Sequence, residues 1–101
     1  MTVTSKDKIL DISVNLARVS DWIFSESQHK QNRVDQFLDE TKMLIVSLSS
    51  IPVSPRFEQT LAQFKIEFAK LLKDKNKTKR EEWAERALTW ANILQHRAKL
   101  A

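Results

Sequence analysis

The chain has 101 residues, of which 42% are hydrophobic and 30% charged, and it contains no glycine, cysteine or tyrosine. Without glycine the sequence has no GxGxxG turn, no Walker-type phosphate loop and no G-x-S-x-G nucleophile elbow. Without cysteine it has no disulfide, no iron–sulfur cluster and no thiolate zinc site. This length is typical of one domain. We therefore expect residues 1–101 to form a single domain around one hydrophobic core.

The net charge of +4 is concentrated in the second half of the chain. Residues 1–50 carry six Lys or Arg against seven Asp or Glu, a balance of −1, whereas residues 51–101 carry eleven against six, a balance of +5. The first eight residues, MTVTSKDK, lack the apolar segment of a secretory signal. The longest apolar run, Met43–Val46, is far shorter than the ~20 residues that span a bilayer. We therefore expect a soluble, cytoplasmic protein with no membrane association.

Apolar residues recur in steps of three and four along four successive segments, which is typical of amphipathic helices. The expected core stripes are, in chain order, Ile9, Ile12, Leu16, Val19 and Ile23; Val34, Phe37, Leu44, Leu48 and Ile51, which keep the same spacing if the polar Thr41 fills the gap; Phe57, Leu61, Phe64, Phe68 and Leu71; and Trp83, Ala87, Trp90 and Leu94. The spacing predicts helices over residues 5–24, 30–50, 55–75 and 79–99. Short connections between such helices favour an all-α, antiparallel up-down-up-down four-helix bundle.

Polar residues at the expected boundaries support these limits. Thr4 with Asp7 three residues later can form a capping box at the start of the first helix. Ser54-Pro55 can begin the third helix, because serine accepts a free amide hydrogen and proline is tolerated at the first helical position. Thr78–Glu81 predicts a capping box for the fourth helix, and Asn76 can end the third in a left-handed conformation.

The connection between the first two helices has two interpretations. Residues Ser25–Arg33 are all polar but include neither glycine nor proline. Continuing the first stripe would place Glu26, Lys30 and Arg33 in the core, which favours a turn here. The alternative is one continuous helix whose exposed stripe is covered by a second copy of the chain.

The reactive side chains form no recognisable catalytic or metal-binding set. Glu26–His29 matches one Glu-x-x-His motif of di-iron bundles, but the second motif is missing, since Ile93 stands three residues before His96. Ser5–Lys8 fits an S-x-x-K pattern without its companion motifs. Ser20 is expected on a helical surface. We therefore predict a protein that is not an enzyme and has no metal and no cofactor.

A cluster of basic residues marks the end of the third helix and the start of the fourth. This basic tip consists of Lys70, Lys73, Lys75, Lys77, Lys79 and Arg80, offset by Asp74. Basic residues near a helix N-terminus can bind phosphate groups. Lysines in a last turn also complement the helix dipole, and no aromatic residue interleaves with them to stack on bases. The tip indicates nucleic-acid binding as the alternative function.

A surplus of apolar residues on the second helix favours protein–protein interaction. One face of that helix can bury Leu44 and Leu48, which leaves Met43 and Val46 pointing elsewhere. Trp22 lies one position off the first stripe, and Ile93 lies outside the fourth. Large apolar patches on soluble proteins are usually covered by a partner. We predict an interaction protein, a homodimer or the partner of another protein, with Met43, Val46, Trp22 and Ile93 at its interface.

Overall fold

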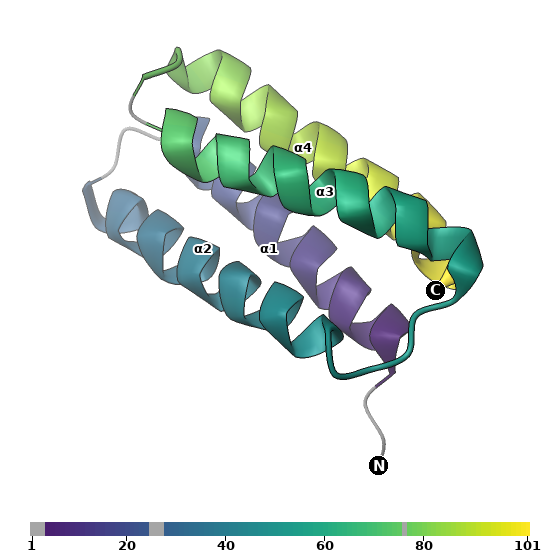
Figure 1. The fold of residues 1–101 in the computed structure, drawn as a ribbon. Helices are drawn as coiled ribbons and strands as arrows, with labels where there is room; N and C mark the ends of the chain where they lie inside the picture. Colours follow the sequence, from purple (N-terminus) through teal and green to yellow (C-terminus); the bar gives the residue numbers. More distant parts are fainter. Residues whose placement is uncertain (1–3, 25–27, 76) are drawn as a thin grey trace.

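A computed structural model describes residues 4–24, 28–75 and 77–101. Within them the chain forms α1 (Ser5–Phe24), α2 (Gln28–Leu48), α3 (Pro55–Asp74), α4 (Arg80–Arg97) and the short 3-10 helix η1 (Ala98–Leu100). Figure 1 shows the four α-helices side by side, with α1 between α2 and α4 and with α3 lying against α4. The predicted all-helical, four-helix fold is confirmed, and each α-helix begins and ends within two residues of its expected limits.

The predicted caps of α1 and α3 are confirmed. The Asp7 amide donates a hydrogen bond to Thr4 Oγ1 at 3.1 Å, and the Thr4 amide donates to Asp7 Oδ2 at 3.3 Å. At the start of α3 the Arg56 amide donates to Ser54 Oγ at 3.3 Å, with Pro55 as the first helical residue. These local hydrogen bonds occupy amide groups that have no acceptor inside the helix.

The start of α4 differs from the prediction. Its N-cap is Lys79, which makes no side-chain cap hydrogen bond. The predicted capping box Thr78–Glu81 is therefore wrong, because Thr78 lies one residue too early to cap the helix. Its backbone amide instead donates to the Asp74 carbonyl at 3.1 Å, which holds the turn after α3. Asn76, predicted to end the third helix, lies outside the described residues.

The core follows the predicted stripes closely in α1 and α3 and less closely in α2 and α4. Every predicted stripe residue of α1 and α3 is buried. In α2, Phe37 and Leu44 are half-buried and packed against the core, and Leu38, which the stripe omitted, is buried. Thr41 is buried as expected and donates its hydroxyl to the Phe37 carbonyl at 2.8 Å. Trp90 of α4 is half-buried, although it belongs to a predicted stripe.

Among the described helices, α1 and α4 make the most extensive contact, and small residues line it. Ala84, Ala87 and Ala91 are all buried on α4. The buried Ser13 hydroxyl of α1 donates to the Ala91 carbonyl at 2.8 Å, and that of Ser20 donates to the Ala84 carbonyl at 2.7 Å. The expectation of a surface position for Ser20 is therefore wrong. Its buried hydroxyl has a hydrogen-bond partner, the Ala84 carbonyl, inside the α1–α4 pair.

The helix α2 folds back along α1. Lys8 near the start of α1 donates from Nζ to Ser47 Oγ near the end of α2 at 2.7 Å. Near the opposite ends, the rings of Trp22 and Phe37 make an edge contact with 4.9 Å between centroids. The alternative of one continuous helix is therefore wrong, although residues 25–27 lie outside the described residues.

Candidate functional site

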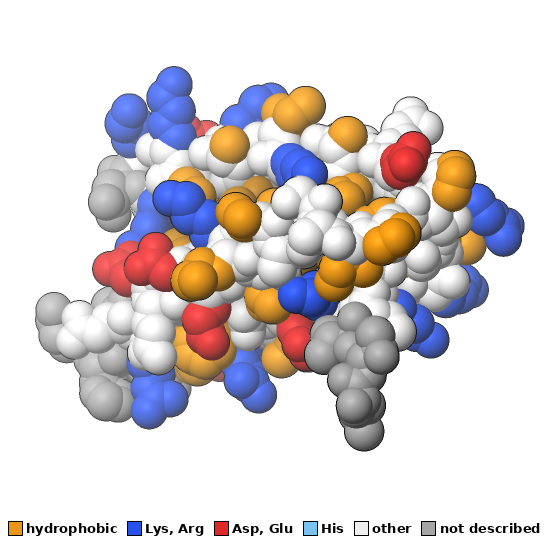
Figure 2. Space-filling model, turned by 60° about the horizontal axis from the view of Figure 1, so that its bottom comes forward, with side chains coloured by type: hydrophobic (Ala, Val, Ile, Leu, Met, Phe, Trp, Pro, Cys, Tyr) orange, Lys and Arg blue, Asp and Glu red, His pale blue; other side chains and the backbone are white. Residues whose placement is uncertain are grey.

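A surface groove of about 610 Å³ separates α1 from α2. We call it the α1–α2 groove; its lining residues are Lys8, Asp11, Val14, Asn15 and Arg18 from α1 and Glu40, Met43, Leu44 and Ser47 from α2. Figure 2 views the molecule from the side that lies at the bottom of Figure 1, and hydrophobic side chains reach the surface across the middle of this face. Met43 is 74% exposed and Val14 is 47% exposed, so apolar side chains open to water lie among the polar residues that line the groove.

The register of the two helices arranges these side chains along the groove. The Lys8–Ser47 and Trp22–Phe37 contacts set the approximate register of the two helices, with 14 residues of α1 against 10 of α2 between them. Interpolation between these contacts places Val14 level with Met43. Lys8 and Asp11 then lie toward one end of the groove, and Arg18 and Glu40 lie toward the other. Each end therefore carries one cation and one anion, with apolar side chains between them.

Several of the groove charges have no partner of opposite charge in the described part of the chain. Neither Asp11 nor Glu40 forms an ion pair with another described residue, and the same holds for Arg18. The Arg18 guanidinium carbon instead lies 6.0 Å from the centre of the Phe37 ring, within the range of a cation–π contact. These charges are available to a molecule that enters the groove.

The structure does not bring the four predicted interface residues into one patch. Met43 and Val46 are exposed on α2, as expected from the surplus of apolar residues there. Trp22 is half-buried against the core and in contact with Phe37. Ile93 belongs to α4, and α1 lies between α4 and α2 (Figure 1). Sequence reasoning did not assign Val14 to the interface. The signal that could have found it is a second row of apolar residues on the first helix, Leu10, Val14 and Ala17.

The basic tip is divided between paired and exposed side chains. Lys75 forms an ion pair with Asp35 of α2, and its side chain is 20% exposed. Lys70 lies 3.5 Å from Glu67 on the same helix, between Nζ and Oε1. Lys77, Lys79 and Arg80 are exposed and make no ion pair with a described residue, as is also true of exposed Lys73. Four of the six predicted phosphate-binding residues are therefore exposed without an ion pair to a described residue, and the side chain of Lys70 is also 59% exposed.

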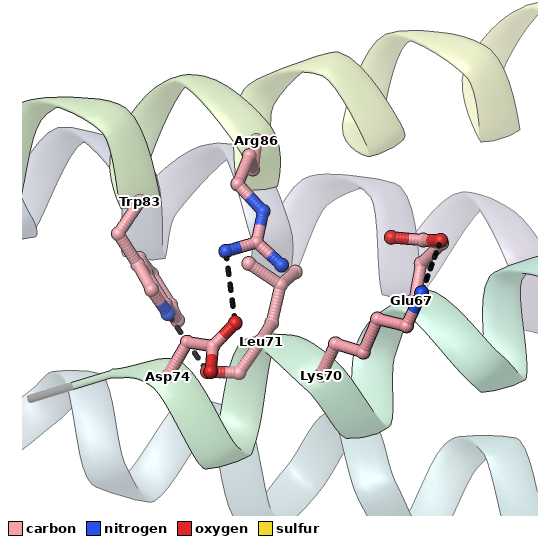
Figure 3. Close-up of polar contacts among 6 residues, drawn as sticks. All are labelled: Glu67, Lys70, Leu71, Asp74, Trp83 and Arg86. Atoms are coloured by element: carbon pink, nitrogen blue, oxygen red, sulfur yellow. Dashed lines mark hydrogen bonds and ion pairs between the residues drawn. The ribbon is translucent and has the colours of Figure 1, made fainter. Parts of the chain in front are cut away.

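Polar contacts next to the tip connect the end of α3 to α4. The Trp83 indole Nε1 donates to the Leu71 carbonyl at 2.8 Å, and Arg86 Nη1 lies 3.3 Å from Asp74 Oδ2 (Figure 3). Trp83 is 1% exposed, as its predicted core position requires. These two contacts hold the end of α3 against α4.

Metal-binding and membrane-spanning features are not found in the described part of the chain. No group of three or more His, Asp or Glu side chains there is placed to hold a metal ion. No described helix is long and apolar enough to cross a bilayer. Of the Glu26–His29 motif, Glu26 lies outside the described residues, and only the backbone of His29 is described, in α2. Comparison with protein-family models, curated proteins and solved structures finds no match for this chain.

Proposed function

We propose that this chain is a small, non-enzymatic helical-bundle protein that associates with itself and binds a protein partner through α2 and the adjoining α1–α2 groove. The exposure of Met43 and Val46, at 74% and 67%, carries this proposal. Both lie on α2, and Met43 is level with exposed Val14 across the groove. Soluble proteins rarely leave such side chains grouped in water, so a partner surface is their expected cover.

Met43→Glu is expected to dissociate the assembly, because it places a charge in the centre of the apolar contact. The measurement is light scattering coupled to size exclusion at several hundred micromolar protein. The parent chain should show a mass well above the 11.8 kDa of one chain, and the variant a mass close to it.

Ile66→Glu is the matched control for this experiment. Ile66 is another exposed apolar residue, but it lies on α3 and outside the groove. It should leave the mass unchanged. A parent chain that stays monomeric at high concentration would contradict self-association, and an equal loss in both variants would contradict the placement of the interface on α2.

Nucleic-acid binding is the second candidate function, supported by the exposure of Lys77, Lys79 and Arg80 around the start of α4. The double variant Lys77→Glu/Lys79→Glu is expected to weaken binding to duplex DNA, because it replaces two cations by two anions. Contacts with three to five phosphates would give a log–log salt slope of roughly −3 to −5 for the parent chain. Fluorescence polarisation at low salt measures both effects.

Lys65→Glu provides the control for the tip, since Lys65 is exposed on α3 away from the loop. Lys75 is avoided because its substitution would also break the ion pair with Asp35. An absence of binding at low salt, or binding that is unchanged in the double variant, would exclude the tip as a phosphate-binding site.

A further inference from the structure

Two charged residues of α1, Asp11 and Arg18, lie symmetrically about the middle of that helix. Because α1 extends from Ser5 to Phe24, its midpoint lies between Val14 and Asn15. Asp11 and Arg18 lie equally far from this midpoint on opposite sides, about 5 Å along the axis at 1.5 Å per residue. Both line the α1–α2 groove, and neither forms an ion pair with another described residue.

A two-fold axis across the midpoint of α1 would give both Asp11 and Arg18 a partner of opposite charge. It lays α1 of one copy antiparallel to α1 of the other and brings each Asp11 to Arg18 of the second copy. In a two-fold interface every such contact occurs twice, so two ion pairs would form. Met43 is level with Val14 and therefore lies near the same axis, where it would meet Met43 of the second copy. The apolar centre and both charged ends are then covered together.

We infer that the occupant of the α1–α2 groove is a second copy of this chain, related to the first by a two-fold axis between Val14 and Asn15. This inference rests on the proposed function and specifies its partner. An unrelated protein would need to carry the matching order of charges independently, whereas a second copy supplies that order by symmetry. No intramolecular ion pair of a described residue has to be broken to form the contact.

Charge reversal tests the arrangement directly. Asp11→Arg alone and Arg18→Asp alone are each expected to weaken dimerisation about tenfold, because each places like charges in both symmetry-related pairs. The double variant Asp11→Arg/Arg18→Asp restores opposite charges and should return to within about threefold of the parent chain. Sedimentation equilibrium over a dilution series measures these constants, and circular dichroism checks that the exposed substitutions keep the fold.

Mixing the two single variants gives a second test. In a dimer of one Asp11→Arg chain with one Arg18→Asp chain, both contacts again join opposite charges, so the mixture should associate more tightly than either variant alone. Glu85→Arg on α4 is the control, because it makes a charge reversal of the same size at an exposed position outside the groove. It should leave the dimerisation constant unchanged.

The outcomes separate this arrangement from the proposed function. One outcome is that Met43→Glu dissociates the dimer while the double variant and the mixture still associate as weakly as the single variants. That result would support the interface on α2 and overturn the two-fold arrangement. If the parent chain is monomeric throughout, both fail. Restored association in the double variant and in the mixture supports the arrangement.

Discussion

Trp83→Ala is expected to lower the free energy of unfolding by about 3–5 kcal/mol, the usual cost of removing a large buried aromatic side chain. Trp83 is 1% exposed, so the substitution leaves a cavity in the core. It also removes the donor for the Leu71 carbonyl, which lies 2.8 Å from the indole nitrogen. Leu71 lies near the end of α3, so this hydrogen bond joins the end of α3 to α4.

Urea unfolding followed by circular dichroism measures this loss. The variant Trp83→Phe separates the effect of the cavity from that of the lost hydrogen bond. It keeps an aromatic ring but removes the hydrogen bond, which contributes about 1 kcal/mol to the free energy of unfolding. Trp90→Ala is the matched control at a half-buried tryptophan of the same helix. It should cost clearly less than Trp83→Ala, and equal losses would contradict the central position of Trp83 in the core.

Ala87→Leu is expected to destabilise the protein by about 1–3 kcal/mol through overpacking. Ala87 is fully buried between Ala84 and Ala91 on the face of α4 that contacts α1. A leucine here would force the two helices apart and would lengthen the hydrogen bonds from Ser13 and Ser20. At the size of this chain each kcal/mol lowers the melting temperature by about 4–8 °C.

Thermal unfolding by calorimetry or circular dichroism measures that shift, with Ala62→Leu as the control. Ala62 is exposed on α3, and the same substitution there should change stability by no more than about 0.5 kcal/mol. A melting temperature for Ala87→Leu that equals that of Ala62→Leu would contradict the close contact between α1 and α4.

The parts of the fold that were predicted correctly depend on local sequence. The stripe of α1 from Ile9 to Ile23 and that of α3 from Phe57 to Leu71 follow from helical periodicity alone. The caps at Thr4 and Ser54 follow from hydrogen bonds between residues two or three positions apart. Such features are visible in sequence because the interacting groups are neighbours in the chain.

The features that were missed depend on contacts between distant segments. Ser20 is polar and was expected at the surface, but the Ala84 carbonyl, 64 residues away, satisfies it in the core. In α2, Phe37 and Leu38 are adjacent and both apolar, so only the position of α1 decides which is buried. The ion pair of Lys75 with Asp35, 40 residues apart, removes one lysine from the predicted basic tip.

The candidate interface residues divide in the same way, into features predictable from local sequence and features that depend on how distant segments pack. The exposure of Met43 and Val46 was predictable because α2 carries more apolar residues than one face can bury. The opposition of Val14 and Met43 was not, because it depends on the register of α2 against α1. The separation of Ile93 from α2 likewise depends on α1 lying between the second and fourth helices.

The hydroxyls of Ser13 and Ser20 connect the first helix to the last, across 78 and 64 residues of sequence. During synthesis, the apolar stripe of α1 stays incompletely covered until α4 has left the ribosome. A shortened chain that ends before Ala84 would leave both hydroxyls without their acceptors and the aliphatic stripe of α1 open to water, so it would be prone to aggregate.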